Sequence, residues 1–184
     1  MKRLVIDTET TGLSPQINKT LTVGLLLIDV EKDFLEIIDS NHLFIKHDNY
    51  NTTKEAMNIN KIDLEEHELN AIPPVKACSQ INSFINKHLL HETPLIGHNI
   101  QFDRGFLNAL FNQGETSHKF NYRHEDTMWM WRNLQRKNLV PWNLRSNLQT
   151  VADFFKIDYT KAHDAIADCH ITAQVYHKLL NLQQ

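Results

Sequence analysis

The stretch VIDTETTG, residues 5–12, decides the fold that this sequence predicts. Its apolar beginning, which Leu4 extends, is typical of a short buried strand, and the threonines and glycine at its end predict a turn. Asp7 and Glu9 are two positions apart, so on an extended segment their side chains point to the same face. Both carboxylates are therefore expected at the carboxyl end of a buried strand, where α/β folds bind their ligands.

Two further acids lie on helical stripes that should face the core. Apolar residues follow Asp103 at offsets of 3, 4 and 7, and follow Asp168 at offsets of 3, 7, 11 and 14. Either acid alone is equally suited to the start of a helix, where a carboxylate is mildly stabilising. An isolated buried charge is costly unless something pairs with it, so four such acids in one fold call for a shared cation. A set made only of carboxylates favours Mg²⁺ or Mn²⁺ over zinc.

His163 stands five residues before Asp168, in the segment that leads into the last predicted helix. Within a helix, that spacing would turn its side chain about 140° away from Asp168. In a loop before the helix, it is free to swing toward the same site. A neutral imidazole beside a cation site is suited to accept a proton from water. Asp164 is expected to be the N-cap of the helix.

The bulk composition is that of one globular domain. The chain has 184 residues, of which 41% are hydrophobic and 22% charged, and a net charge of −3. It lacks the basicity of a protein that coats nucleic acid, and no apolar run approaches the roughly 20 residues of a membrane span. The N-terminus does not resemble a secretory signal, and Cys78 and Cys169 form no C-x-x-C pair. We therefore expect buried thiols in a cytoplasmic protein.

The order of predicted elements indicates an α/β domain with a mixed sheet. Strands are expected at residues 4–6, 21–30, 34–46 and 94–97. Helices are expected at 53–58, 64–69, 74–89, 102–111, 148–155 and 164–182. The stretch 128–147 contains all three tryptophans and has the least regular pattern.

Three ordered motifs resemble those of the DEDDh, or DnaQ-like, 3′–5′ exonucleases, which have a ribonuclease H-like fold. They are D-x-E-T-T-G from Asp7, H-N-x-x-F-D from His98 and H-x-A-x-x-D from His163. Weaker matches are Asp126-Thr127 after a fifth strand, and the stretch 147–151. The resemblance spans nearly the whole chain. It implies a single exonuclease domain over residues 1–184, with a central five-stranded mixed β-sheet flanked by helices on both faces.

The resemblance also implies a reaction, the hydrolysis of single-stranded or frayed DNA or RNA from its 3′ end to nucleoside 5′-monophosphates. Two divalent ions, Mg²⁺ or Mn²⁺, would take part. Asp7, Glu9 and Asp168 would hold the first ion, Asp7 and Asp103 the second, and His163 would be the general base.

Substrate contacts follow from the same resemblance. Thr10 resembles a residue whose backbone meets the terminal 3′-hydroxyl, and Leu13 an apolar wedge against the terminal base. Phe102 resembles a residue that packs on a base, and His98 and Asn99 line the next sugar and phosphate. Phe102 is equally suited to the core, and Asn99 to fixing its loop.

Several alternatives stay open at this point. The chain fits a stand-alone enzyme, a proofreading subunit with a polymerase or replication partner, an RNA-trimming relative, or a non-catalytic nucleic-acid-binding module. The sequence decides neither DNA against RNA nor the oligomeric state. The stretch 128–147, with Arg132, Arg136, Lys137 and Arg145 among its tryptophans, fits a nucleic-acid platform, a subunit interface, or a core helix with a solvated face.

Overall fold

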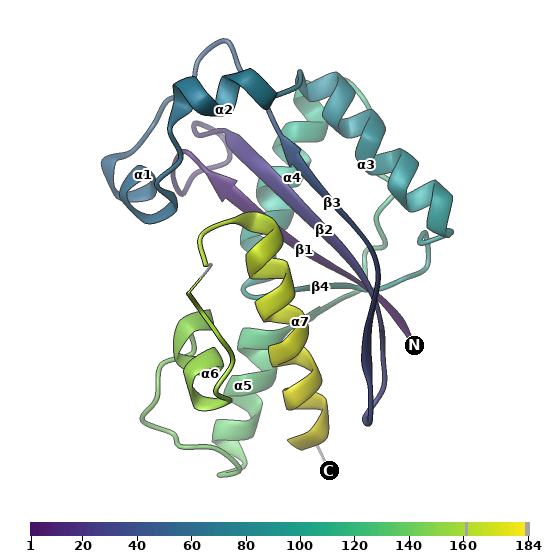
Figure 1. Ribbon diagram of the computed structural model, residues 1–184, viewed down its shortest axis with the longest axis vertical. Coiled ribbons are helices and arrows are strands. Elements are labelled where there is room, and N and C mark those ends of the chain that lie inside the picture. Colours follow the sequence, from purple (N-terminus) through teal and green to yellow (C-terminus); the bar gives the residue numbers. More distant parts are fainter. Residues whose placement is uncertain (161, 183–184) are drawn as a thin grey trace.

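A computed structural model describes residues 1–160 and 162–182 and contains a five-stranded sheet of order β3-β2-β1-β4-β5 (Figure 1). The central strand, β1 (Lys2–Thr10), pairs antiparallel with β2 (Thr20–Val30), which pairs antiparallel with β3 (Leu35–Phe44). On its other side β1 pairs in parallel with β4 (Leu95–Gly97), and β4 with β5 (His124–Asp126). The mixed five-stranded sheet implied by the motifs is confirmed.

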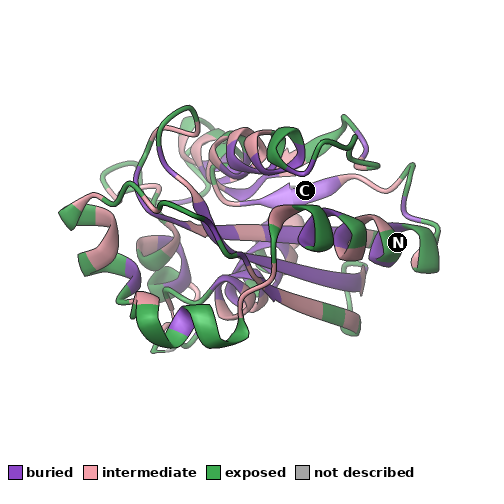
Figure 2. Cartoon of the chain, turned by 90° about the horizontal axis from the view of Figure 1, so that it is seen from above, coloured by how far each residue is buried: buried purple, intermediate pink, exposed green. Residues whose placement is uncertain are grey.

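Helices cover both faces of this sheet, as expected. They are α1 (Lys54–Asn60), α2 (Leu64–Asn70), α3 (Pro74–His88), α4 (Ile100–Gln113), α5 (Thr127–Arg136), α6 (Leu148–Phe154) and α7 (Ala165–Leu182). One apolar cluster joins α3 and α4 to one face, and a second joins α7 to the other. A third cluster packs α5 and α6 against α7. Seen from above, the central strands are largely buried, the edge strand β3 is largely intermediate or exposed, and the helices on either side are exposed on their outer faces (Figure 2).

The alternation of β1 assigns its side chains to these two faces. Leu4 and Ile6 belong to the cluster under α3 and α4, whereas Val5 belongs to the cluster under α7. Asp7 and Glu9 continue the row of Val5, because side chains two apart share a face of a strand. The strand extends to Thr10, further than the predicted 4–6, because β2 pairs along its whole length. The two acids therefore lie on the α7 side of the strand end.

A glycine in β2 lets α7 approach the sheet beside these acids. Gly24 is the cross-strand neighbour of Asp7. A Cβ atom at Gly24 would lie 2.4 Å from the backbone oxygen of Ala165 and 3.0 Å from Sγ of Cys169. Only a residue without a side chain fits between β2 and the first turns of α7. This close approach places Asp168 next to β1.

The first half of the least regular stretch, 128–147, forms α5, in agreement with the alternative of a core helix with a solvated face. Trp131 and Leu134 bury one stripe of this helix, and the Asp126 side chain caps its start by accepting the Met128 N–H. Trp129 lies on the exposed side. Trp131 and Leu134 therefore face the core, whereas Trp129 shares the outer side with Arg132 and Arg136.

Two further observations bear on the expectations from composition. Cys78 and Cys169 are both buried free thiols, as expected. Among the helices of the described residues, none is long and apolar enough to cross a membrane.

Candidate active site

Three carboxylates meet between the end of β1 and the start of α7. Asp7, Glu9 and Asp168 each offer one oxygen, and these oxygens lie within 4.8 Å of one another. Oδ2 of Asp168 accepts the backbone N–H of His163 at 3.3 Å. Its Oδ1 is buried and has no hydrogen-bond partner within residues 1–160 and 162–182. An orphaned buried oxygen beside two further carboxylates fits the donor set of a hard divalent cation.

Asp103 reaches this group from the opposite side of β1. It is buried in the first turn of α4, and its Oδ1 accepts the Thr8 hydroxyl at 2.8 Å. Thr8 alternates with Asp7 and Glu9 along the strand, so it lies on the α4 face. The four acids were expected to share one point. Instead, Asp7, Glu9 and Asp168 form a group of three, and Asp103 lies next to it on the other face of β1. The charge of Asp103 still acts on Asp7, whose pKa it raises.

Burial disfavours the ionised form of all four carboxyl groups, and the charges of Asp103 and Asp168 add to this at Asp7 and Glu9. Burial raises the pKa of Asp7 well above its ordinary value, and the charges of Asp103 and Asp168 add to this. Burial, followed by the charges of Asp168 and Asp103, raises the pKa of Glu9 to about 8. Burial also raises the pKa of Asp103 to about 7, against the hydrogen bond from Thr8, and that of Asp168 to about 6, against the His163 N–H. Such a constellation is typical of a functional site.

His163 lies at the open edge of the carboxylate group. It is exposed, has a left-handed φ of 72°, and its ring meets the edge of Tyr159 at 6.1 Å between centroids. Asp164 caps α7 as expected, since its Oδ1 accepts the N–H of Ala167 at 3.0 Å. The His163 backbone is thus fixed by Asp168 while its ring stays accessible.

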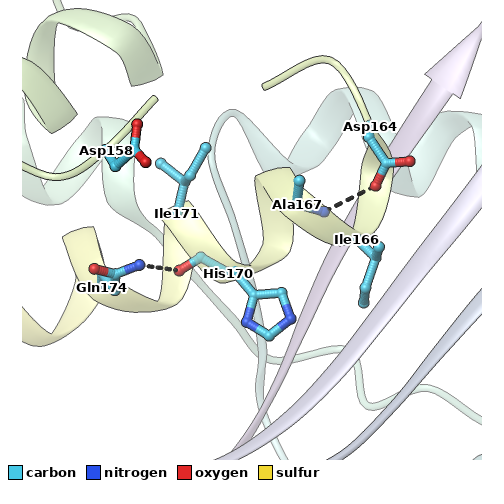
Figure 3. A pocket seen from close by; sticks show the side chains of 7 residues that line it. All are labelled: Asp158, Asp164, Ile166, Ala167, His170, Ile171 and Gln174. Atoms are coloured by element: carbon cyan, nitrogen blue, oxygen red, sulfur yellow. Dashed lines mark hydrogen bonds between the residues drawn. The ribbon is translucent and has the colours of Figure 1, made fainter. Parts of the chain in front are cut away.

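A hollow of about 500 Å³ flanks this loop on the outer side of α7 (Figure 3). Its lining comes from α7 and the loop before it: Asp158, Asp164, Ile166, Ala167, His170, Ile171 and Gln174. Some of its polar groups form hydrogen bonds within α7, where Gln174 donates to the His170 carbonyl. The hollow lies near the carboxylate group, but on a different face of α7.

Leu13, in the loop after β1, is 82% exposed. Thr10 is buried, and its hydroxyl donates to the Gly12 carbonyl at 2.7 Å. Asn18 packs against Gly12, where a Cβ atom would lie 2.4 Å from the asparagine side chain, and accepts the Ser14 N–H. These contacts fix the turn that presents Leu13.

His98 is held in the protein frame by both ring nitrogens. Nε2 lies 2.8 Å from the Ser146 carbonyl, and Nδ1 lies 2.9 Å from the Thr127 hydroxyl. Because a carbonyl only accepts, Nε2 carries a proton. The single Thr127 hydroxyl proton is shared between Nδ1 and the Gly97 carbonyl, which lies 3.2 Å away. Burial lowers the pKa of His98 and so favours the neutral ring. Neither nitrogen is left for a phosphate oxygen, and the ring ties the β4–α4 turn to residue 146.

The two neighbours of His98 in the motif remain accessible. Asn99 is exposed and adopts a left-handed conformation with φ 64°, which asparagine tolerates better than most residues. Phe102 is half-buried, with its ring 4.9 Å from that of Phe106. The turn itself is held by Asp126, whose two oxygens accept the N–H groups of Asn99 and Ile100.

Sequence reasoning missed two residues that shape the site, and quoted a third without giving it a role. Gly24 sets the approach of α7, and Thr8 holds Asp103. Asp126, quoted above only as a weaker motif match, clamps the turn before α4. A glycine inside an apolar strand signals a close backbone approach, so Gly24 was open to prediction. The partners of Thr8 and Asp126 depend on packing between distant segments.

A sequence profile of the exonuclease family RNase_T matches residues 4–176. The chain belongs to this family of DEDDh-type exonucleases. Comparison with curated protein sequences gives no match. The ribonuclease H-like fold of this exonuclease domain is also that of solved exonuclease I structures.

Three such structures illustrate the likeness. E. coli exonuclease I with a dT13 oligonucleotide gives a TM-score of 0.82 at 18% identity, over 99% of this chain and 41% of that one. The zinc-bound form of an E. coli exonuclease I–ssDNA complex gives 0.79 at 21%, over 100% and 41%. SSB/exonuclease I with the inhibitor CFAM gives 0.77 at 17%, over 98% and 43%. At these identities the likeness establishes the fold, and the chain spans about two fifths of the length of those proteins.

The close approach at Gly24 can be tested in this exonuclease domain with Gly24→Ala. The new Cβ atom would push the first turn of α7 off β2 and separate Asp168 from Asp7. We expect a loss of about 1–3 kcal/mol in the free energy of unfolding, as for other overpacked sites. We also expect a smaller stabilisation by Mn²⁺. Urea unfolding with and without Mn²⁺ measures both.

Gly105→Ala is the matched control. A Cβ atom at Gly105, inside α4, would lie 3.4 Å from Pro15, an ordinary contact. Alanine favours a helix over glycine by about 1 kcal/mol, so this variant should be neutral or more stable. Equal behaviour of the two variants would show that Gly24 has no special packing role.

The raised pKa values of the exonuclease domain give stability a definite pH dependence. Folded Glu9, Asp103 and Asp168 hold protons up to about pH 8, 7 and 6, whereas unfolded carboxyl groups release them near pH 4. The folded state binds more protons across this window, so these groups lower stability as pH rises. We expect the metal-free protein to melt at a lower temperature at about pH 8.5 than at about pH 5.5.

A divalent cation held by these carboxylates would favour their ionised forms and should therefore reverse this trend. The rise in melting temperature on adding Mn²⁺ or Mg²⁺ should be larger at the higher pH. Thermal unfolding at both pH values, with chelator or with metal, measures it. A metal-induced rise that is equal at both pH values would contradict a site made of these carboxylates.

Proposed function

We propose that this domain is a 3′–5′ exonuclease that hydrolyses single-stranded or frayed DNA or RNA to nucleoside 5′-monophosphates. The proposal includes two divalent ions, Mg²⁺ or Mn²⁺. The observation that carries it is the group of Asp7, Glu9 and Asp168, with oxygens within 4.8 Å and one buried oxygen of Asp168 unpartnered in the described chain. Family membership supports the reaction class.

The carboxylates divide between the two ions. Asp7, Glu9 and Asp168 would hold the first ion, and Asp7 and Asp103 the second, consistent with Asp103 standing apart on the Thr8 side. When bound, the ions would neutralise charge on the attacking and leaving oxygens of the scissile phosphate. The carboxylates would hold these positive ions at the edge of the sheet, between the carboxyl end of β1 and the start of α7.

His163 is the proposed general base. Its exposed ring lies on the loop that Asp168 fixes through a backbone hydrogen bond. It would take a proton from the attacking water as the oxygen of that water bonds to phosphorus. The bond from phosphorus to the 3′ oxygen of the preceding nucleotide breaks, and this oxygen takes a proton from solvent. The products are a nucleoside 5′-monophosphate and a strand shorter by one nucleotide.

The substrate contacts proposed for these residues suit a single-stranded 3′ end. Leu13, which is exposed, and Phe102, which is half-buried, would offer apolar surface to the terminal base. The Thr10 backbone would meet its sugar, and Asn99 the next phosphate. His98 contributes indirectly, by fixing the turn that carries Asn99. Apolar stacking without contacts to base edges makes binding tolerant of sequence.

Incubation of the purified protein with 5′-labelled single-stranded DNA or RNA tests the proposal. With Mg²⁺ or Mn²⁺ we expect a ladder that shortens from the 3′ end, and mononucleotide 5′-phosphates as products. The ladder should be absent with chelator. Comparison of the rates on DNA and on RNA measures the preference for deoxyribose or ribose. Strands with blocked 3′ ends should resist hydrolysis if the enzyme degrades from the 3′ end. No hydrolysis of either strand with either metal would refute the enzymatic function.

A further inference from the structure

The segment Thr127–Ala152 differs in charge from the rest of the molecule. It contains four basic side chains, Arg132, Arg136, Lys137 and Arg145, and no acidic one, in a chain whose net charge is −3. It also exposes two large aromatic side chains, with Trp129 47% and Trp142 80% accessible. Exposed tryptophans among these basic side chains suit a partner that has both negative charges and flat rings.

The outer stripe of α5 arranges part of this surface. Trp129, Arg132 and Arg136 follow one another at helical spacings of three and four residues, opposite the buried Trp131 and Leu134. The Arg132 guanidinium carbon lies 5.0 Å from the centre of the Trp129 ring. This cation–π contact holds a positive charge against the tryptophan face before any ligand arrives.

Hydrogen bonds fix the following loop to α5. Nε of Arg132 donates to the Ser146 hydroxyl at 3.0 Å. The Gln135 side-chain amide donates to the carbonyls of Pro141 at 3.0 Å and Leu144 at 2.8 Å. Trp142 and Arg145 are therefore presented from a fixed loop beside the stripe of Trp129, Arg132 and Arg136. We call these five residues the platform.

The platform is continuous with the candidate active site. The Ser146 carbonyl accepts the Nε2–H of His98 at 2.8 Å, so the loop that touches Arg132 also touches the β4–α4 turn. Asn99 of the same turn, and Asp103 in the first turn of α4, belong to the proposed catalytic centre. A strand with its 3′ end at the carboxylates would have its next nucleotides near this turn.

We propose that the platform binds the substrate nucleotides on the 5′ side of the scissile phosphate. Bases would stack on Trp129 and Trp142, and phosphates would pair with Arg132, Arg136 and Arg145. Such contacts read no sequence but require an unpaired strand. This inference rests on the proposed function, which supplies the position of the 3′ end. Its consequence is that affinity increases with strand length until the platform is covered.

The test measures binding without catalysis, by fluorescence anisotropy of 5′-labelled oligothymidylates of about 3, 6 and 12 nucleotides in chelator. For the wild type, we expect affinity to rise with length. Trp129→Ala and Trp142→Ala should each weaken the longest strand about 5- to 150-fold, the loss of one stacked base, and affect the shortest strand little. Trp142 is too exposed for its removal to threaten folding.

The charges are tested by salt dependence. In Arg136→Gln/Arg145→Gln, the slope of log affinity against log salt should fall by about 1.4, since each phosphate contact on a single strand contributes about 0.7. The matched control is Lys76→Gln, which removes an exposed cation from α3 on the opposite face of the sheet. This control should keep the wild-type slope and length dependence.

The outcomes separate the alternatives. Unchanged length dependence in both tryptophan variants, or an unchanged slope in the arginine variant, overturns the platform. An equal loss for the shortest and longest strands also overturns it, because that indicates a general structural effect. Polyglutamate that competes as well as an oligonucleotide would indicate an acidic protein partner instead. Length-dependent binding without hydrolysis in Mn²⁺ would support the platform while refuting the proposed exonuclease activity.

Discussion

Replacing Asp7 with asparagine is expected to reduce the hydrolysis rate about 10⁴-fold, because the proposed catalysis loses the carboxylate shared by both ions. A loss of this size corresponds to roughly 5 kcal/mol of transition-state stabilisation, in the range that a bound metal supplies. The side chains have nearly equal volumes, so the fold should survive. Single-turnover hydrolysis of a labelled strand in Mn²⁺ measures the effect.

The same substitution should stabilise the metal-free protein. Burial and the charges of Asp103 and Asp168 disfavour the ionised Asp7, and a neutral amide removes that cost. At pH values above the ordinary range of a carboxyl group, we expect the melting temperature to rise by about 2–8 °C, the shift that 1–2 kcal/mol gives in a chain of this size. Loss of activity together with a lower melting temperature would indicate damage to the fold, and full activity would exclude Asp7 from the site.

His163→Asn is expected to reduce the rate about 10²- to 10⁴-fold, the usual contribution of a general base. Asparagine tolerates the left-handed backbone of this position, whereas alanine does not. His163→Ala should therefore show the same loss of rate with lower stability. Both variants keep the backbone N–H that Asp168 accepts.

Metal binding by these variants distinguishes whether His163 acts as a general base or as a ligand of the metal ion. The stabilisation by Mn²⁺ should be retained in His163→Asn and lost in Asp7→Asn. Thermal unfolding over a range of Mn²⁺ concentrations provides the comparison. If His163→Asn lost the metal-induced stabilisation as well, His163 would act in holding the ion, and the proton acceptor would have to be another group.

Much of the candidate site could be predicted from local periodicity. The two-residue spacing of Asp7 and Glu9 and the inward stripe of Asp168 are short-range properties, and the structure brings these three together. The five-stranded sheet with helices on both faces was implied by the family resemblance that the three motifs carry. Asp164 was predicted as a cap from its position before an apolar helical stripe.

Other features depend on contacts between distant segments. Asp103 is held apart by Thr8, 95 residues away in sequence, so no local pattern could separate it from the other acids. The hydrogen bonds of His98 to Thr127 and Ser146 likewise appear only when the turn, α5 and the loop are packed together. The sequence offered a core helix at α5 only as one of three alternatives, and the packing of Trp131 and Leu134 against α6 and α7 decides for it.

Asp126 makes one rigid block of two regions that the sequence separates. Its carboxylate accepts the N–H groups of Asn99 and Ile100 before α4, and that of Met128 at the start of α5. Hydrogen bonds to a charged acceptor are about twice as strong as neutral ones, so the two helix starts resist independent movement. If the proposed function is correct, the distance between the platform that binds the strand and the carboxylates that cleave it is then constant. After each cleavage, the shortened strand must move forward by one nucleotide before its new 3′ end reaches the carboxylates.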